Sequence, residues 1–198
     1  MTDSNPSYIV QREGLPADFP THLHAPAFWE ELGRTVATFG FLEETLGKAI
    51  FAFSGTREVD EEDVERELEG WSTTLERALS DPLGGLIDLF GKTLRENKRA
   101  TISNANELIG DLRKAAAVRN VLCHGSWRLP DASGASVPLF VNKRMDVFVS
   151  RVDLAYLRQT RAHVVDLVCS VIDTVTHMGY QFPGSRGPGT PIWRASQA

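Results

Sequence analysis

The sequence RNVLCHGSW, residues 119–127, closes a run of helical periodicity and opens the strand-like part of the chain. Upstream, apolar residues recur in steps of three and four, at Ala105, Ile109, Leu112, Ala116 and Cys123. This spacing is typical of one face of an α-helix. Gly125 occupies a position at which helices commonly end. We therefore predict a helix that ends beside Gly125.

The last turn of this helix places polar side chains in apolar surroundings. Its apolar neighbours predict burial on several sides and leave only Arg119, Asn120 and His124 polar. A buried guanidinium needs partners, and the helix dipole favours a cationic histidine in the last turn. Arg119 and His124 lie about 140° apart around an ideal helix. They would converge through the long arginine side chain, through a distorted helix end, or across a twofold axis between two copies.

The motif R-N-x-x-x-H followed by glycine, on the third long helix of a helical chain, resembles the HEPN superfamily. The resemblance covers roughly residues 26–180 and implies an all-α bundle of four to five helices that run up and down. It also implies a homodimer and a metal-independent ribonuclease whose arginine and histidine come from both subunits. Arg119, His124 and Asn120 would be catalytic, with Glu43 and Ser126 in support. In HEPN toxins paired with nucleotidyltransferase antitoxins, a modified tyrosine stands where this chain has Ser126, which argues against that regulation.

These residue types suit RNA cleavage. The reaction needs a group that takes the proton of the 2′-hydroxyl and a cation that stabilises the phosphorane. Histidine titrates near neutral pH and arginine matches phosphate geometry, while Asn120 could orient the imidazole or bind phosphate. Internal attack would leave a 2′,3′-cyclic phosphate. Further cations that we expect to contact RNA are Arg113, Lys114 and Arg128.

Composition limits the other function classes. The chain has 198 residues, 42% of them hydrophobic, enough for one good core. A net charge of -5 means that RNA binding would depend on a local basic patch. No nucleotide-binding glycine-rich loop, zinc-type cluster or nucleophile elbow occurs, so we expect neither cofactor nor metal. Without a signal peptide or an apolar spanning run, we expect a cytoplasmic protein with no membrane partner.

Two charged residues, each of which interrupts an apolar helix face, predict a contact between distant helices. The first helix begins near Pro26, ends near Gly55 and carries an apolar stripe that Glu43 interrupts. Since Arg119 interrupts the stripe of the motif helix, we expect these two charges to pair in the core. The alternative is that Glu43 lies at the edge of its stripe and reaches water. Cys123 and Cys169 also lie on apolar faces, and we expect both to be buried and reduced.

The remaining segments complete the predicted organisation. The acidic run Glu58–Glu69 is interpreted as the solvated face of a helix that breaks at Asp81–Pro82. Alternating apolar residues predict a small antiparallel hairpin or meander at about 126–150, before a last long helix capped by Ser150 with Asp153. Residues 1–25 would form an irregular arm whose histidines, His22 and His24, lie at the surface. Residues 181–198 would be a disordered tail.

Two functional interpretations remain open. The first is an endoribonuclease, such as a toxin or defence effector, with RNA as substrate and an antitoxin or regulatory protein as a further partner. The second is a catalytically silent HEPN-like binding or scaffold module, in which Arg119 is an ion-pair partner and His124 a helix cap. A third class, a small-molecule sensor, has only the expected pocket beneath the hairpin to support it.

Overall fold

A computed structural model describes residues 8–185 as a bundle of five α-helices with three short 3-10 turns. The turns are η1 (Arg12–Gly14), η2 (Thr21–Leu23) and η3 (Glu61–Asp63). The helices are α1 (Pro26–Gly55), α2 (Val64–Ser80), α3 (Leu83–Glu96), α4 (Ala105–His124) and α5 (Leu154–Thr176).

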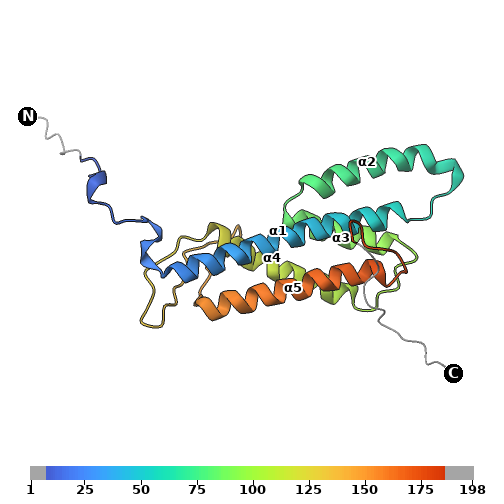
Figure 1. The fold of residues 1–198 in the computed structure, drawn as a ribbon. Coiled ribbons are helices and arrows are strands. Elements are labelled where there is room, and N and C mark those ends of the chain that lie inside the picture. The colour runs from blue at the N-terminus through green and yellow to red at the C-terminus, as the bar shows by residue number, and fades with distance from the viewer. Residues whose placement is uncertain (1–7, 186–198) are drawn as a thin grey trace, which may run out of the picture.

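Successive helices alternate in direction, so the bundle runs up and down as predicted (Figure 1). The long helix α1 is its axis: α5 lies along it over most of its length, and α3, α2 and α4 pack against its other sides. This confirms the all-α prediction. Within residues 8–185, no helix combines the length and apolar composition needed to cross a membrane.

The helix ends follow local sequence chemistry. Pro26 occupies the first turn of α1, where its missing N–H needs no partner. Asp81 and Pro82 separate α2 from α3, as the sequence predicts, because proline cannot continue the preceding helix. Asp153, rather than Ser150, caps α5: its carboxylate accepts a hydrogen bond from the Tyr156 amide at 2.7 Å.

The core is centred on α1, whose apolar face is buried from Phe28 to Phe53. Large side chains with no more than 1% exposure include Phe39 and Phe53 of α1, Phe90 of α3, Leu112 of α4 and Leu157 of α5. Helix α2 contributes little, because Ala78 is its one buried residue. The acidic face of α2 is solvated, as expected, and this helix adheres to the outside of the bundle.

The predicted β insertion is wrong. Residues 126–150 form three isolated antiparallel bridges with their surroundings, Ser126–Leu139, Ser136–Val152 and Val141–Val147, and no sheet. Pro138 lies inside the alternating run and cannot donate to a ladder. Leu139, Val141, Val147 and Val149 are exposed, so no second layer covers their alternating face. Alternation here reflects extended backbone without the partner strands that would build a sheet.

The N-terminal arm is anchored by His24, which we had expected at the surface. Its side chain is buried, with Nε2 2.9 Å from Ser136 Oγ and the ring stacked on Phe28 at 4.3 Å. The edge of Trp127 closes the cluster. Within residues 8–185 its Nδ1 has no hydrogen-bond partner. Burial lowers the pKa of His24 below its ordinary 6.5.

This environment predicts a pH-dependent stability. An unfolded chain takes up the proton of His24 more readily than the folded chain does, so the stabilisation is complete above about pH 6.5 and is lost as pH falls through the lowered pKa. We expect His24→Phe to flatten the fall in unfolding free energy between about pH 7 and 5, measured by urea denaturation. His22→Phe, at an exposed position, is the matched control and should retain the wild-type slope. Equal slopes for His24→Phe and wild type would contradict this assignment.

Candidate functional site

The predicted stripe of α4 is buried at Ile109 and Leu112 and departs from the prediction at the end of the helix. There Leu122 is buried, whereas Cys123 is exposed. One residue corresponds to about 100° of rotation, so the bundle covers the side of Leu122 and leaves the side of Cys123 open. The expectation that the last turn is buried on several sides is therefore wrong. Cys169, on α5, is also exposed, which corrects the prediction for both cysteines.

The predicted contact between Glu43 and Arg119 is confirmed. Arg119 Nη2 lies 3.5 Å from Glu43 Oε1, and the two side chains are 28% and 29% exposed. The pair is therefore partly buried and joins α4 to α1 at the middle of the bundle. Glu43 Oε1 itself is out of contact with water and accepts no hydrogen bond from residues 8–185. The contact is electrostatic and leaves an acceptor unused.

The partial burial predicts a modest contribution to stability. Fully exposed pairs contribute a few tenths of a kcal/mol, whereas breaking a buried pair costs about 3 to 5 kcal/mol. Since the pair is about three-tenths exposed and lacks a hydrogen bond, we expect Glu43→Ala to lower the unfolding free energy by about 1 kcal/mol. Glu44→Ala, which removes a more exposed partner of Lys48, is the control and should change it less in the same urea titration. A loss of about 3 kcal/mol for Glu43→Ala would mean that the pair is fully desolvated.

Asn120 and His124 face solvent at the end of α4. Both are exposed, and the His124 side chain makes no hydrogen bond or ion pair with any residue in 8–185. The helix remains regular up to His124, because the Gly125 amide donates to the Val121 carbonyl at 2.8 Å. Ser126 is exposed as well, and its backbone exchanges two hydrogen bonds with Leu139. The imidazole is accessible, and neighbouring groups leave it free to contact a ligand.

Gly125 ends α4 as predicted, and the chain itself requires a glycine there. A Cβ at this position would lie 2.6 Å from the Val121 carbonyl oxygen and 2.9 Å from Pro138 Cβ. Its φ of -70° lies outside the left-handed region. The small residue therefore allows the loop to cross the helix end closely, which explains its presence without reference to a ligand.

The other predicted RNA contacts are spread along α4 and beyond it. Arg113 pairs with Asp88 at 2.7 Å and Lys114 with Asp111 at 2.8 Å. The hydrogen bond to Asp111 raises the pKa of Lys114. Arg128 is exposed and has no ion-pair partner among residues 8–185. Of the three cations, Arg128 is thus the one that follows the motif closely and is unpaired.

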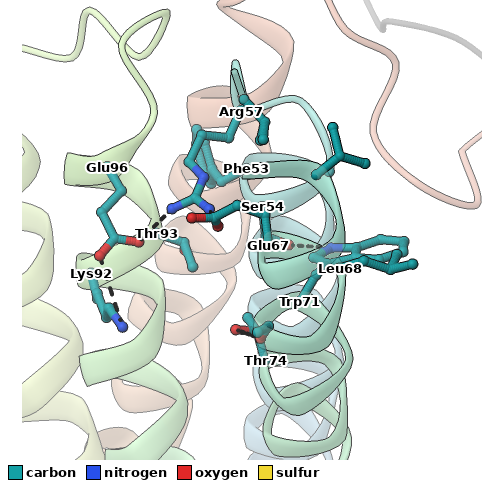
Figure 2. Close-up of a pocket in the computed structure, with 14 residues that line it drawn as sticks. Phe53, Ser54, Arg57, Glu67, Leu68, Trp71, Thr74, Lys92, Thr93 and Glu96 are labelled. Carbon is teal, nitrogen blue, oxygen red and sulfur yellow. Dashed lines mark hydrogen bonds and ion pairs between the residues drawn. The ribbon is translucent and has the colours of Figure 1, made fainter. Parts of the chain in front are cut away.

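Sequence reasoning missed a pocket of about 340 Å³ between α1, α2 and α3. Figure 2 shows Arg57 at its mouth between Glu67 and Glu96, with Lys92 beside Glu96 and the Trp71 indole directed at Ser54. Because the charges cancel in pairs, the pocket is electrically balanced, and exposed Val64 and Leu68 make part of its wall apolar. The sequence signal that could have indicated this pocket is the helical spacing of apolar residues within the acidic run at the start of α2.

No cluster of metal-binding side chains occurs in the described part of the chain. Residues 8–185 contain no group of three or more His, Cys, Asp or Glu side chains that could hold a metal ion. The histidines of the arm do not converge, since His24 is turned into the aromatic cluster and His22 is exposed. What the geometry offers for chemistry is an accessible imidazole and amide, and an anchored guanidinium on another side of the same helix end.

The fold and the site therefore define an all-helical bundle with an exposed histidine at one helix end and a partly buried arginine five residues before it. Comparisons with protein-family models, with curated proteins and with solved structures found no match.

Proposed function

We propose that this chain is a HEPN-type, metal-independent endoribonuclease with a composite site formed by two copies. The observation that carries the proposal is a contrast at the end of α4. Arg119 is held in place by Glu43, while His124 and Asn120 stay open to solvent. An anchored cation and a free imidazole are the two groups that phosphoryl transfer from RNA needs.

The geometry disfavours two of the three ways in which Arg119 and His124 could converge. The helix is regular to its end, so distortion does not turn the histidine toward the arginine. Glu43 draws the guanidinium toward α1, so the arginine does not extend toward the histidine of its own chain. The third route, a twofold axis, remains. Gly40 on α1 lies about one turn from Glu43, is exposed and has open space beside it, which leaves room for a second copy.

The proposed reaction uses each group in one role. His124 accepts the proton of the 2′-hydroxyl, whose oxygen attacks the adjacent phosphorus. The bond from phosphorus to the 5′-oxygen breaks as the 2′,3′-cyclic phosphate forms, and the departing 5′-oxygen takes a proton from solvent. Arg119 stabilises the additional negative charge of the phosphorane. Asn120 binds a phosphate oxygen or orients the imidazole, and Arg128 contacts the phosphate of a flanking nucleotide. Ser126 lies beside this end of the helix, where its hydroxyl is exposed.

RNA cleavage by the purified chain in EDTA, with light scattering on the same sample, tests the proposal. We expect a dimer at micromolar concentration and products that end in a 2′,3′-cyclic phosphate. A monomer would overturn the composite site. Intact RNA across single-stranded and structured substrates, with and without cellular partners, would overturn the enzyme. For an active enzyme, we propose a toxin or defence effector that an antitoxin or regulatory protein neutralises.

A binding or scaffold module is the second candidate, and one observation favours it. The charge of Arg119 is already compensated by Glu43, as in a purely structural ion pair. In that case His124 would end the helix without acting on RNA. Retained partner binding by a chain that leaves RNA uncut would identify this module.

A further inference from the structure

An apolar groove of about 560 Å³ lies between α1, α2 and α3, apart from the predicted catalytic residues except at Glu43. Gly47 and Ala78 line it where α2 packs closely on α1, since a Cβ at Gly47 would lie 2.9 Å from the Ala78 carbonyl oxygen. Of the other lining side chains, Phe51 is 46% exposed and Leu79 is 90% exposed. Exposed apolar side chains on two walls of one groove favour an apolar occupant.

The rim of the groove adds a requirement for positive charge. Three carboxylates line it, from Glu43, Glu44 and Asp81. Glu44 is satisfied by Lys48 at 2.6 Å and Asp81 by Arg77 at 2.8 Å. Glu43 pairs with Arg119 through Oε1, which is out of contact with water and is therefore not open to the groove. Because three carboxylates and only one cation, Lys48, line the groove among residues 8–185, an occupant with a positive charge beside its apolar group would complement both the walls and the rim.

The chain itself carries such a segment within reach. Pro183 lines the groove, and the next residue, Gly184, lies close to Lys48. Ten residues beyond Pro183 the sequence reads Ile192–Trp193–Arg194, two large apolar side chains followed by an arginine. Ten extended residues span at most roughly 33 Å, enough to leave the groove and return to it. The intervening GSRGPGTP is rich in glycine and proline, which suits a connecting turn.

We propose that this groove binds Ile192–Arg194 of the same chain. The Trp193 indole packs between Phe51 and Leu79, and the Arg194 guanidinium lies beside the carboxylates of the rim. Trp193 buries a large area at a small entropic cost, and Arg194 gives the contact its direction. The proposal does not depend on the ribonuclease function, because it concerns a surface that neither Asn120 nor His124 lines.

Fluorine NMR of the full chain labelled with 5-fluorotryptophan tests the proposal. The chain has four tryptophans, and Trp193→Phe assigns the resonance of interest. We expect Trp193 to resonate away from the position of a solvated indole and to move to that position in Leu79→Asp. Leu79 is 90% exposed, so this change should leave the fold intact. Trp71 on the same helix verifies this, because its contact with Ser54 holds α2 on α1.

Leu68→Asp is the matched control, since Leu68 is an exposed leucine of α2 that lines the other pocket. It should leave the Trp193 resonance unchanged. Arg194→Ala should shift Trp193 part of the way toward the solvated position. A solvated Trp193 in the wild type, or no response to Leu79→Asp while Trp71 is unchanged, would overturn the proposal. A Trp193 shift that disappears on dilution would assign the groove to the tail of a second copy and would also overturn it.

Discussion

His124→Ala is expected to reduce RNA cleavage by about 10²- to 10⁴-fold, the usual contribution of positioned acid–base catalysis. His124 is exposed at the end of α4, and its side chain makes no hydrogen bond or ion pair with residues 8–185 that its removal would break. The far-ultraviolet circular dichroism, the dimer mass and the urea midpoint should therefore stay at their wild-type values. The measurement is the initial rate of cleavage of a fluorescent RNA in EDTA.

A second histidine serves as the control. His163 on α5 is also exposed and lines the groove between α4 and α5, away from the motif, so His163→Ala should retain the wild-type rate. Equal losses for the two variants would mean that the rate follows overall surface charge. An unchanged rate for His124→Ala, in a preparation freed of contaminating nucleases, would refute the assigned role.

The sequence predicts the helices and one long-range contact well, for a shared physical reason. Helical periodicity is local, so the bounds of α1 and the break at Asp81–Pro82 can be read from spacing and proline chemistry. Glu43 and Arg119 were paired because each interrupts an apolar stripe, and two buried charges satisfy one another most simply. Such reasoning predicts that a contact exists. It overestimated the burial of this pair, because a stripe does not show how far its edge is covered.

The predictions fail where the burial of a residue depends on which other segments pack against it. Cys123 fits the spacing of the predicted stripe as well as Leu122 does, and the position of the bundle against α4 selects Leu122. The alternation in 126–150 is genuine, but Pro138 and the absence of partner strands prevent a sheet. Phe182 is buried against the core, inside the stretch expected to be disordered, and the remainder of that prediction concerns residues 186–198, outside the described part.

The pocket and the apolar groove along α2 could not be predicted from the sequence, for a different reason. Each is lined by residues from three helices, and Ala78 of α2 packs closely against Gly47 of α1. A glycine in a helix pattern has several ordinary explanations. Only its position opposite a carbonyl oxygen shows that it lets two helices meet. The candidate catalytic residues could be proposed from the sequence because they lie within six consecutive positions of one helix, where a motif can be recognised.

Mixing two inactive variants should restore cleavage if the site is composite. In the twofold arrangement supported by the regular helix end and the Glu43-bound arginine, each site takes Arg119 from one protomer and His124 from its partner. A mixed dimer of Arg119→Ala with His124→Ala then contains one site with both groups intact and one with neither. Random pairing places half of the chains in mixed dimers, each with one of two sites, so about a quarter of the wild-type rate should return.

The control for this experiment still forms mixed dimers, but none of them contains an intact His124. Mixing His124→Ala with the double variant Arg119→Ala, His124→Ala supplies no intact histidine, and it should leave cleavage at the level of either parent. The chains are unfolded and refolded together so that protomers exchange, and the yield of mixed dimers is measured by mass. Mixed dimers that form but remain as inactive as their parents would show that Arg119 and His124 do not act in one site across the axis. Because the two groups lie about 140° apart on a regular helix, such a result would also make a site within one protomer difficult to build and would favour the binding module.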